Sequence, residues 1–212
     1  MSLETKSGFI HAAFLEAGTI SLSSKSGNVK AADVRAGELG ISTTSGSIKS
    51  FDLNVEGPLG ITSVSGGVRV VGARASSLDA STVSGAARLD RTVVAGRLVA
   101  ESVSGKLSVS ASRADLMKAS SVSGSVRLDG IRPHASLRVE CVSGSVAIAL
   151  PLDLSFALEA NSKSGDMSYV LDGSNQVSAG GRLSLRWGDE PACRVGVETV
   201  SGSVRIVRGG LS

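Results

Sequence analysis

Hydrophobic and polar positions alternate along this chain in a pattern that repeats every 19 to 21 residues. The dipeptide Ser-Gly marks the repeat: it occurs ten times between Ser7 and Gly202, and only its last interval, 37 residues, is much longer. With the Ser as position 1, positions 4 and 6 are mostly apolar, and two further apolar positions precede the motif. Positions two apart lie on one face of a β-strand, so each repeat predicts two short strands.

The same residue type recurs at the same phase along the whole chain, which indicates coils stacked in register rather than the dissimilar strands of a sandwich. We therefore predict an all-β fold, a single parallel β-solenoid (β-helix) of about eleven coils spanning residues 1–212, with a right-handed turn. The coils are 19–20 residues long, and the segment around Gly181 is assigned to the coil missing from the last interval. Residues 172–193 are expected to form an irregular loop or degenerate coil.

The interior of each coil is predicted from the alternation around the motif. The Gly, position 4 and position 6 are expected to point inward, with the Gly at a bend where a Cβ would collide. The residue before the Ser is often Val and is also expected to point inward. A corner is expected near the Ser/Thr column, the Ser or Thr residues directly before these valines, such as Ser63 and Thr82. These valines are Val64, Val83, Val103, Val122, Val142 and Val200.

Composition agrees with a narrow interior, since aromatic residues make up only 3% and there are 26 glycines. The net charge of +3 permits an anionic partner without requiring one. No segment has the ~20 apolar residues of a membrane-spanning helix, and the chain shows no targeting segment. We expect the chain to be part of a longer protein. The cell envelope, the extracellular space and the cytoplasm therefore all remain open as compartments.

Three segments carry a family resemblance: SVSGSVRLDG, KSGDMSYVLDG and the closing VETVSGSVRIVRGG. They resemble the repeats of the bacterial adhesin-like family, a family of β-solenoid domains of unknown function, and the resemblance covers nearly the whole chain. It implies the solenoid fold and an adhesin-like, non-enzymatic role. It implies no catalytic residue and no cofactor.

Position 5 carries the most distinctive chemistry, because cations recur there in consecutive repeats. Stacked like charges ~4.8 Å apart repel, so an extended anionic polymer or cell-surface glycan would compensate them. The alternative is a solvated face whose long side chains cover apolar strand surface. The cations of this column are Lys30, Lys49, Arg69, Arg88 and Arg127. Stacking aromatic residues are absent from this face, and we expect no nucleic acid partner.

Catalytic and metal sites are not indicated. The serines of the motif form a column without a nearby His, since His11 and His134 lie far apart in the repeat, and hydrogen bonding to turns explains them better. Acids alternate with bases on a second face, which favours cross-coil ion pairs over paired catalytic carboxylates. That face carries Glu101, Lys118, Arg138, Glu140 and Glu159.

Cys141 and Cys193 are expected to be free thiols, because an assignment three coils apart separates them by ~14 Å. Trp187 lies in the irregular segment and marks a candidate ligand loop. The sequence shows no cap for the ends of the solenoid, so end-to-end self-association is also expected.

The sequence therefore predicts a non-catalytic bacterial scaffold or surface-interaction domain. The alternative is a β-helix protein that binds carbohydrate or anionic polymers, or cleaves polysaccharides. A concave groove with clustered carboxylates would favour cleavage, and smooth faces would favour the scaffold.

Overall fold

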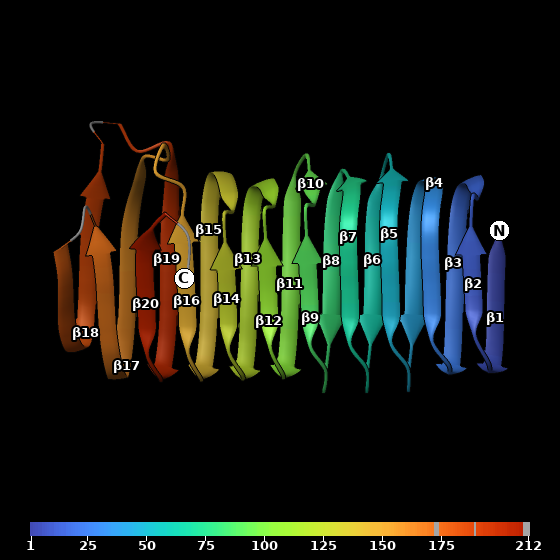
Figure 1. The fold of residues 1–212 in the computed structure, drawn as a ribbon, viewed down its shortest axis with the longest axis horizontal. Helices are drawn as coiled ribbons and strands as arrows, with labels where there is room; N and C mark the ends of the chain where they lie inside the picture. Colours follow the sequence, from blue (N-terminus) through green and yellow to red (C-terminus); the bar gives the residue numbers. More distant parts are fainter. Residues whose placement is uncertain (172–173, 189, 210–212) are drawn as a thin grey trace.

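The computed structural model describes residues 1–171, 174–188 and 190–209, and they form a rod of stacked strands (Figure 1). Nearly all pairs are parallel and join a strand to its equivalent in the next repeat, which confirms the parallel β-solenoid. No described segment is a helix of the length and apolarity needed to cross a membrane. The right-handed turn stays a prediction.

The strands have the following bounds: β1 (Ser2–Ser7), β2 (Ile10–Ala13), β3 (Glu16–Ser26), β4 (Val29–Thr43), β5 (Ile48–Val55), β6 (Pro58–Ser63), β7 (Val68–Ala75), β8 (Ser77–Thr82), β9 (Ala87–Asp90), β10 (Val93–Val94), β11 (Arg97–Ser104), β12 (Leu107–Ser110), β13 (Arg113–Ser123), β14 (Val126–Asp129), β15 (Arg132–Ser143), β16 (Val146–Leu150), β17 (Phe156–Leu171), β18 (Ser174–Trp187), β19 (Cys193–Ser201) and β20 (Val204–Arg208).

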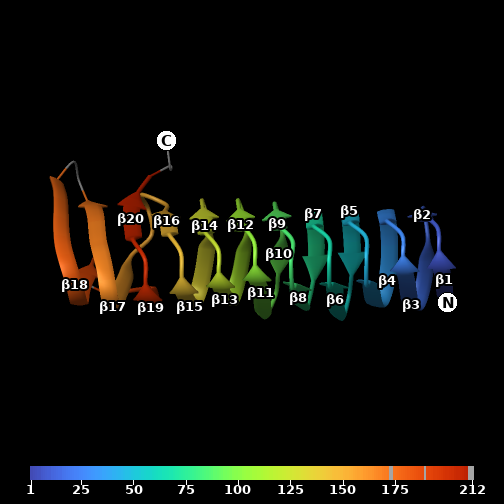
Figure 2. The ribbon, with the colours of Figure 1, turned by 90° about the horizontal axis from the view of Figure 1, so that it is seen from below.

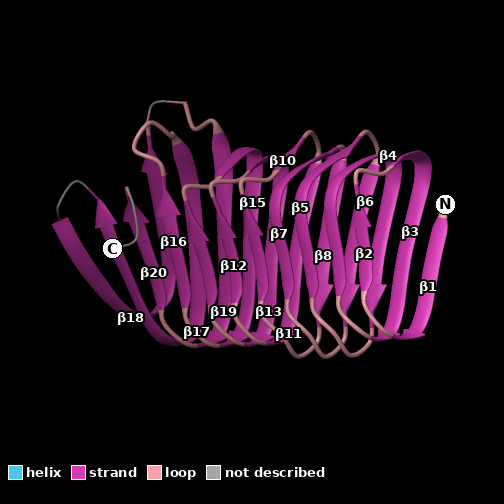
Figure 3. Cartoon of the chain, turned by 45° about the vertical axis from the view of Figure 1, so that its right-hand side comes forward, coloured by secondary structure: helices cyan, strands magenta, loops and turns pink. Residues whose placement is uncertain are grey.

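Each coil has two long walls and one short wall, seen obliquely in Figure 3. The first wall precedes the Ser-Gly motif, as in β6 and β8, the second follows it, as in the first four residues of β5 and β7, and the short wall comes last, as in β10 and the end of β7. The walls enclose columns of Leu, Ile, Val and Ala, and the described core contains one fully buried aromatic side chain, Phe156. Small and branched side chains fill the narrow interior, as the composition indicates.

The Ser-Gly corner depends on a close approach between successive coils. A Cβ on Gly66 would lie 1.8 Å from the carbonyl oxygen of Gly46, so only glycine fits, as predicted. Beside it the Ser/Thr column is buried. Thr82 Oγ1 donates a hydrogen bond to the Gly66 carbonyl at 2.9 Å, and Ser63 Oγ donates to the Gly46 carbonyl at 3.0 Å. These side chains satisfy carbonyls that the strand ladder leaves unpaired at the corner.

The prediction that the valines before the motif point inward is wrong. Inward alternation continues through the Ser/Thr column, so the next residue points outward and the phase changes only between this residue and the Gly. Val83 is 46% exposed and Val122 is 48% exposed. The six valines therefore form an exposed column along the corner, which we call the outer valine ladder.

A second corner follows position 7, where the chain leaves the second wall. In successive coils the residue at position 8 adopts a left-handed conformation, with φ between 47° and 71°. These residues are Phe14, Asp33, Asp52, Gly72, Arg91, Ala111 and Gly130. Gly and Asp tolerate this region and occupy four of the seven positions, whereas Phe14, Arg91 and Ala111 adopt it although their residue types disfavour it, so the stacking of the walls holds the corner in those coils.

The last coils do not follow the order of the chain. After β16 the chain passes to β17, and the final coil, β19 and β20, inserts between them: β19 pairs with β15 and β17, and β20 pairs with β16 and β17 (Figure 2). The assignment of Gly181 to a parallel coil is wrong, since it lies in β18 opposite Ser162 of β17 in an antiparallel pair. The described stack therefore has fewer coils than the eleven predicted.

The segment 172–193 is mostly regular, not a loop, because β18 forms a hairpin with β17 that closes this end of the rod (Figure 1). Residues 172, 173 and 189 of that prediction lie outside the described residues. The sequence offered no cap, and β18 is itself an end strand, since among the described strands it pairs with β17 alone.

Both cysteines are free, as predicted, and both are buried, but the distance argument was wrong. Cys141 lies opposite Thr199, so the coil of Cys193 is adjacent and not three coils away. Six residues of extended strand, ~20 Å, separate Cys193 from Thr199 along that coil. The thiols are thus apart within the coil plane. Burial raises the pKa of both.

Candidate functional site

The basic column predicted at position 5 lies along the outer face of the second wall. Lys30 pairs in register with Lys49, Lys49 with Arg69, and Arg69 with Arg88. Ser108 then separates Arg88 from Arg127. We call Lys30, Lys49, Arg69 and Arg88 the cation ladder. Strands in a parallel sheet lie ~4.8 Å apart, so these four charges span ~14 Å.

The cation ladder borders a shallow hollow of about 220 Å³. Lys49, Arg69 and Arg88 line it together with Lys106, and the small residues Gly67 and Ala86 lie between them. No carboxylate lines the hollow, and no ion pair involves a ladder residue among the described residues. Arg127, by contrast, lies 3.8 Å from Asp129. The ladder therefore presents cations without protein counter-ions.

Sequence reasoning missed Lys106, which lies at position 3 of its repeat and not at position 5. Positions 3 and 5 both point outward from one strand, so adjacent columns can share a hollow. The alternation alone could therefore have placed Lys106 on the outer face. It was missed because the residues at position 3 of the neighbouring repeats are small or uncharged, so no column of cations was visible there.

Trp187 does not lie on a protruding loop. It ends β18 opposite Phe156 of β17 and packs partly buried against the core. The Arg208 guanidinium lies 4.2 Å from the centre of its ring, a cation–π contact, and Arg208 also donates to the Leu152 carbonyl. The protein's own side chains thus cover this ring.

A larger groove, of about 890 Å³, runs along the first wall beside the outer valine ladder. Val83, Val103, Val122, Val142 and Val200 form one side of it. The opposite side is polar and includes Ser81, Glu101, Ser120, Glu140 and Glu198. The sequence did not indicate this groove, since it placed the valines inside.

The acids of this groove form the cross-coil ion pairs that the sequence predicted. Lys118 Nζ lies 3.4 Å from Glu101 Oε1 and 3.4 Å from Glu140 Oε2. Within β15, Arg138 Nε donates to Glu140 at 2.6 Å, and across the coils Arg138 also reaches Glu198. Glu159, the remaining predicted member, pairs with Arg182 at 3.1 Å.

The charges set the acidity of this network. Burial acts to raise the pKa of Glu140, but the hydrogen bond from Arg138 and the charge of Lys118 outweigh it and hold that pKa below its ordinary value. Glu140 is thus an anion at neutral pH and has no proton to donate. Asp79 behaves oppositely, because burial and the nearby charge of Glu101 raise its pKa.

A third hollow, of about 630 Å³, follows the left-handed corner near the N-terminal end. Three acids, Glu16, Asp33 and Asp52, line it with three arginines, Arg35, Arg74 and Arg91. Its mixed charges give no excess of either sign. Within the described residues, no group of three or more His, Cys, Asp or Glu side chains is arranged to hold a metal ion.

The serines of the Ser-Gly motif have a structural role, as predicted. Its hydroxyls donate to the valine carbonyls of the neighbouring coil, for example Ser104 Oγ to the Val83 carbonyl at 3.4 Å. His11 lies opposite Lys30, and His134 lies 3.8 Å from Asp115. Neither contact joins a histidine to a serine of the motif.

A family model described as Toastrack DUF4097 matches residues 1–130 and, in a second segment, residues 114–207. No curated protein and no solved structure matches the chain. The two segments together include the cation ladder, the outer valine ladder and the inserted final coil. The match agrees with the resemblance to a β-solenoid domain of unknown function.

Proposed function

The chain belongs to the Toastrack DUF4097 family, and from the surfaces of its solenoid we propose that it is a non-catalytic, adhesin-like interaction domain of a bacterium. Its partner is an extended anionic polymer, such as an acidic cell-surface glycan, which lies along the cation ladder. The observation that carries this proposal is the stack of Lys30, Lys49, Arg69 and Arg88, for which the described part of the chain provides no ion pair.

Electrostatics supports a polymer over a small anion. At 0.1 M salt the Debye length is ~10 Å, so each cation of the ladder feels its neighbours and gains from an anion shared between coils. The hollow is shallow and follows the rod, and Lys106 adds a further cation beside it. A linear polyanion can contact all of these groups at once, whereas a single small anion contacts one or two.

Charge reversal tests the proposal. The variant Lys49→Glu, Arg69→Glu, Arg88→Glu is expected to bind immobilised dextran sulfate at least about tenfold more weakly at 0.1 M NaCl, because repulsion replaces attraction at three coils. The control is Arg35→Glu, Arg74→Glu, Arg113→Glu, which changes the net charge equally on an exposed column of the short wall. Equal losses in the two variants, or no loss in the first, would refute a specific role for the ladder.

Polysaccharide cleavage is the second candidate, because Glu101, Glu140 and Glu198 line one groove. Against it, cations pair with all three carboxylates, whereas a glycosidase needs one acid with a raised pKa, and Asp79, whose pKa is raised, does not line this groove. New reducing ends after incubation with polygalacturonate would establish this candidate and reject the non-catalytic one.

A further inference from the structure

The outer valine ladder is an apolar surface that the described residues leave exposed. Its six members are between 42% and 48% exposed and occupy consecutive coils. Ser hydroxyls that donate to valine carbonyls fix their order in the stack: Val64, Val83, Val103, Val122, Val142, Val200. With ~4.8 Å between coils, the ladder is ~24 Å long.

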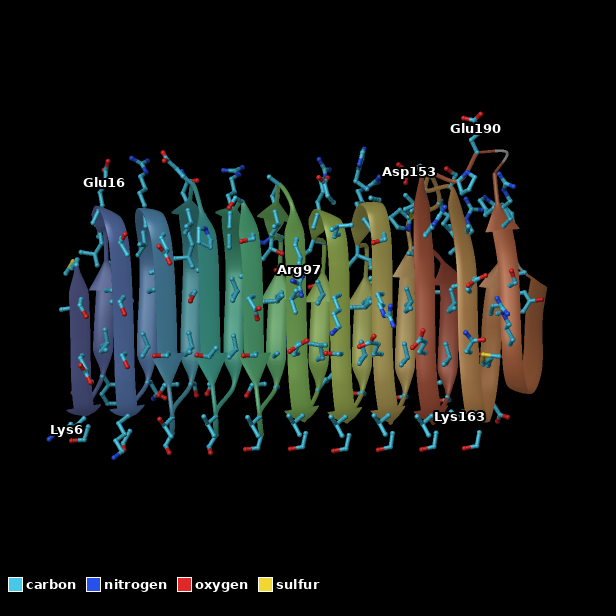
Figure 4. All side chains as sticks on the ribbon, turned by 180° about the vertical axis from the view of Figure 1, so that it is seen from behind. Lys6, Glu16, Arg97, Asp153, Lys163 and Glu190 are labelled. Carbon is cyan, nitrogen blue, oxygen red and sulfur yellow. The ribbon has the colours of Figure 1, made fainter. Side chains whose placement is uncertain are left out.

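Polar residues end the ladder on both sides. Thr44 precedes Val64 in the column, and Lys6 and Lys25 lie beyond it. At the other end Lys163 follows Val200, because Ser164 Oγ donates to the Val200 carbonyl. Figure 4 shows Lys6 and Lys163 near opposite ends of the same long edge of the rod. The apolar stripe thus has a defined length.

The spacing of the ladder identifies the shape that fits it. Branched side chains that repeat every ~4.8 Å match the period of an identical ladder, so two copies can pack valine against valine and exclude water between them. We propose that the occupant is a second copy of this chain, docked ladder to ladder about a two-fold axis so that the two rods run antiparallel.

The antiparallel direction follows from the ends of the ladder. A two-fold axis between Val103 and Val122 places Val64 opposite Val200, Val83 opposite Val142 and Thr44 opposite Lys163. A parallel alignment would instead place Lys163 against the same residue of the other copy, and like charges in contact destabilise an interface. The reversed order therefore buries six valines per chain without opposing the lysines.

The polar side of the groove is complementary under the same axis. Thr62, Ser81, Glu101, Ser120, Glu140 and Glu198 follow one another along it. Reversal of this order places Glu101 opposite Ser120, Glu140 opposite Ser81, and Glu198 opposite Thr62. No carboxylate then faces another carboxylate: each lies opposite a Ser or Thr, of which Ser120 already donates to Glu101 of its own chain at 3.2 Å. A single axis thus satisfies both sides of the groove.

The interface is narrow, so we expect a weak dimer whose population depends on concentration. Sedimentation equilibrium of the whole chain up to millimolar concentration measures it. Val83→Glu alone, or Val142→Lys alone, is expected to raise the dissociation constant at least about tenfold, because a buried charge then faces valine. The double variant Val83→Glu, Val142→Lys is expected to recover dimerisation, since each new carboxylate faces a new ammonium of the other copy.

Positions 83 and 142 are three coils apart, ~14 Å, so the introduced charges cannot pair within one chain. Their rescue therefore reports the antiparallel register, and a parallel dimer would be weakened further by the double variant. The matched control is Val93→Glu, because Val93 is 43% exposed but lies on the short wall. It should leave the dissociation constant unchanged.

Three results would overturn the proposal. The first is a wild-type monomer at millimolar concentration, and the second is a double variant that stays as weak as the single ones. The third is association that Val83→Glu does not change, which would indicate contact through the open edges of the end strands. Loss of a bound fluorescent fatty acid on Val83→Glu in a wild-type monomer would assign the ladder to an acyl chain instead.

Discussion

At the residue scale, the Ser-Gly motif allows successive coils to stack closely. The glycine lets one carbonyl approach the next coil, and the buried Ser or Thr of that coil donates to this carbonyl. In the position of Thr82, Cys141 substitutes for the hydroxyl and its Sγ lies 3.6 Å from the Gly124 carbonyl. The glycine recurs because each corner needs a missing Cβ, and most corners also have a nearby donor; among the described residues, the hydroxyls of Ser121, Ser162 and Thr199 are the members of this column without a hydrogen-bond partner.

Replacement of the corner glycine should be costly. We expect Gly66→Ala to lower the free energy of unfolding by about 2–3 kcal/mol, because its Cβ meets backbone that cannot move aside without shifting a coil. Gly60→Ala is the control, since no heavy atom lies within 4 Å of a Cβ built there. Urea unfolding followed by circular dichroism compares them, and equal effects would contradict the steric role of Gly66.

The buried hydroxyls differ in what they contribute. Thr82→Val removes the bond to the Gly66 carbonyl and is expected to cost about 1 kcal/mol. Thr199 occupies the same column, but its buried hydroxyl has no hydrogen-bond partner. Thr199→Val should therefore be neutral or stabilising. The difference in urea midpoint between the two variants measures the bond, and a larger loss at Thr199 would show that the hydroxyl column has another role.

At the element scale, the final coil is an internal element although it comes last in the sequence. Strands β19 and β20 have a partner on both sides, and contacts between neighbouring repeats supply much of the stability of a solenoid. The first coil, in contrast, has a neighbour on one side only. The two coils should therefore contribute unequally to the same fold.

Truncation tests whether the final coil contributes more to stability than the first coil does. A chain that ends at Ala192 loses two interfaces and leaves β17 and β18 detached, so its free energy of unfolding should fall at least about twice as far as that of a chain lacking residues 1–14. Limited proteolysis of the first variant should cut within residues 151–192. Equal losses of stability, measured by urea unfolding, would argue against an inserted coil that holds the end of the rod.

At the scale of the whole molecule, the rod presents different chemistry on different sides. The cation ladder faces outward from the second wall, the outer valine ladder follows the Ser-Gly corner, and the ion-paired network covers the first wall. Each surface is continuous because the coils stack in register: a residue type that recurs at one position of the repeat forms a column with ~4.8 Å between its members. The repeat therefore determines surfaces as well as the core.

The amino-acid sequence alone determined the architecture and the cation ladder, because stacking in register forces equivalent positions to carry equivalent residues. Lys49 and Arg69 could be placed together from phase alone, and so could the cross-coil pair of Glu101 and Lys118. The outward direction of Val83 was decided by the tertiary structure, since the alternation rule for strands does not show where a corner changes the phase. The insertion of β19 was also decided there, because the order of coils depends on pairing between distant segments and not on any local pattern.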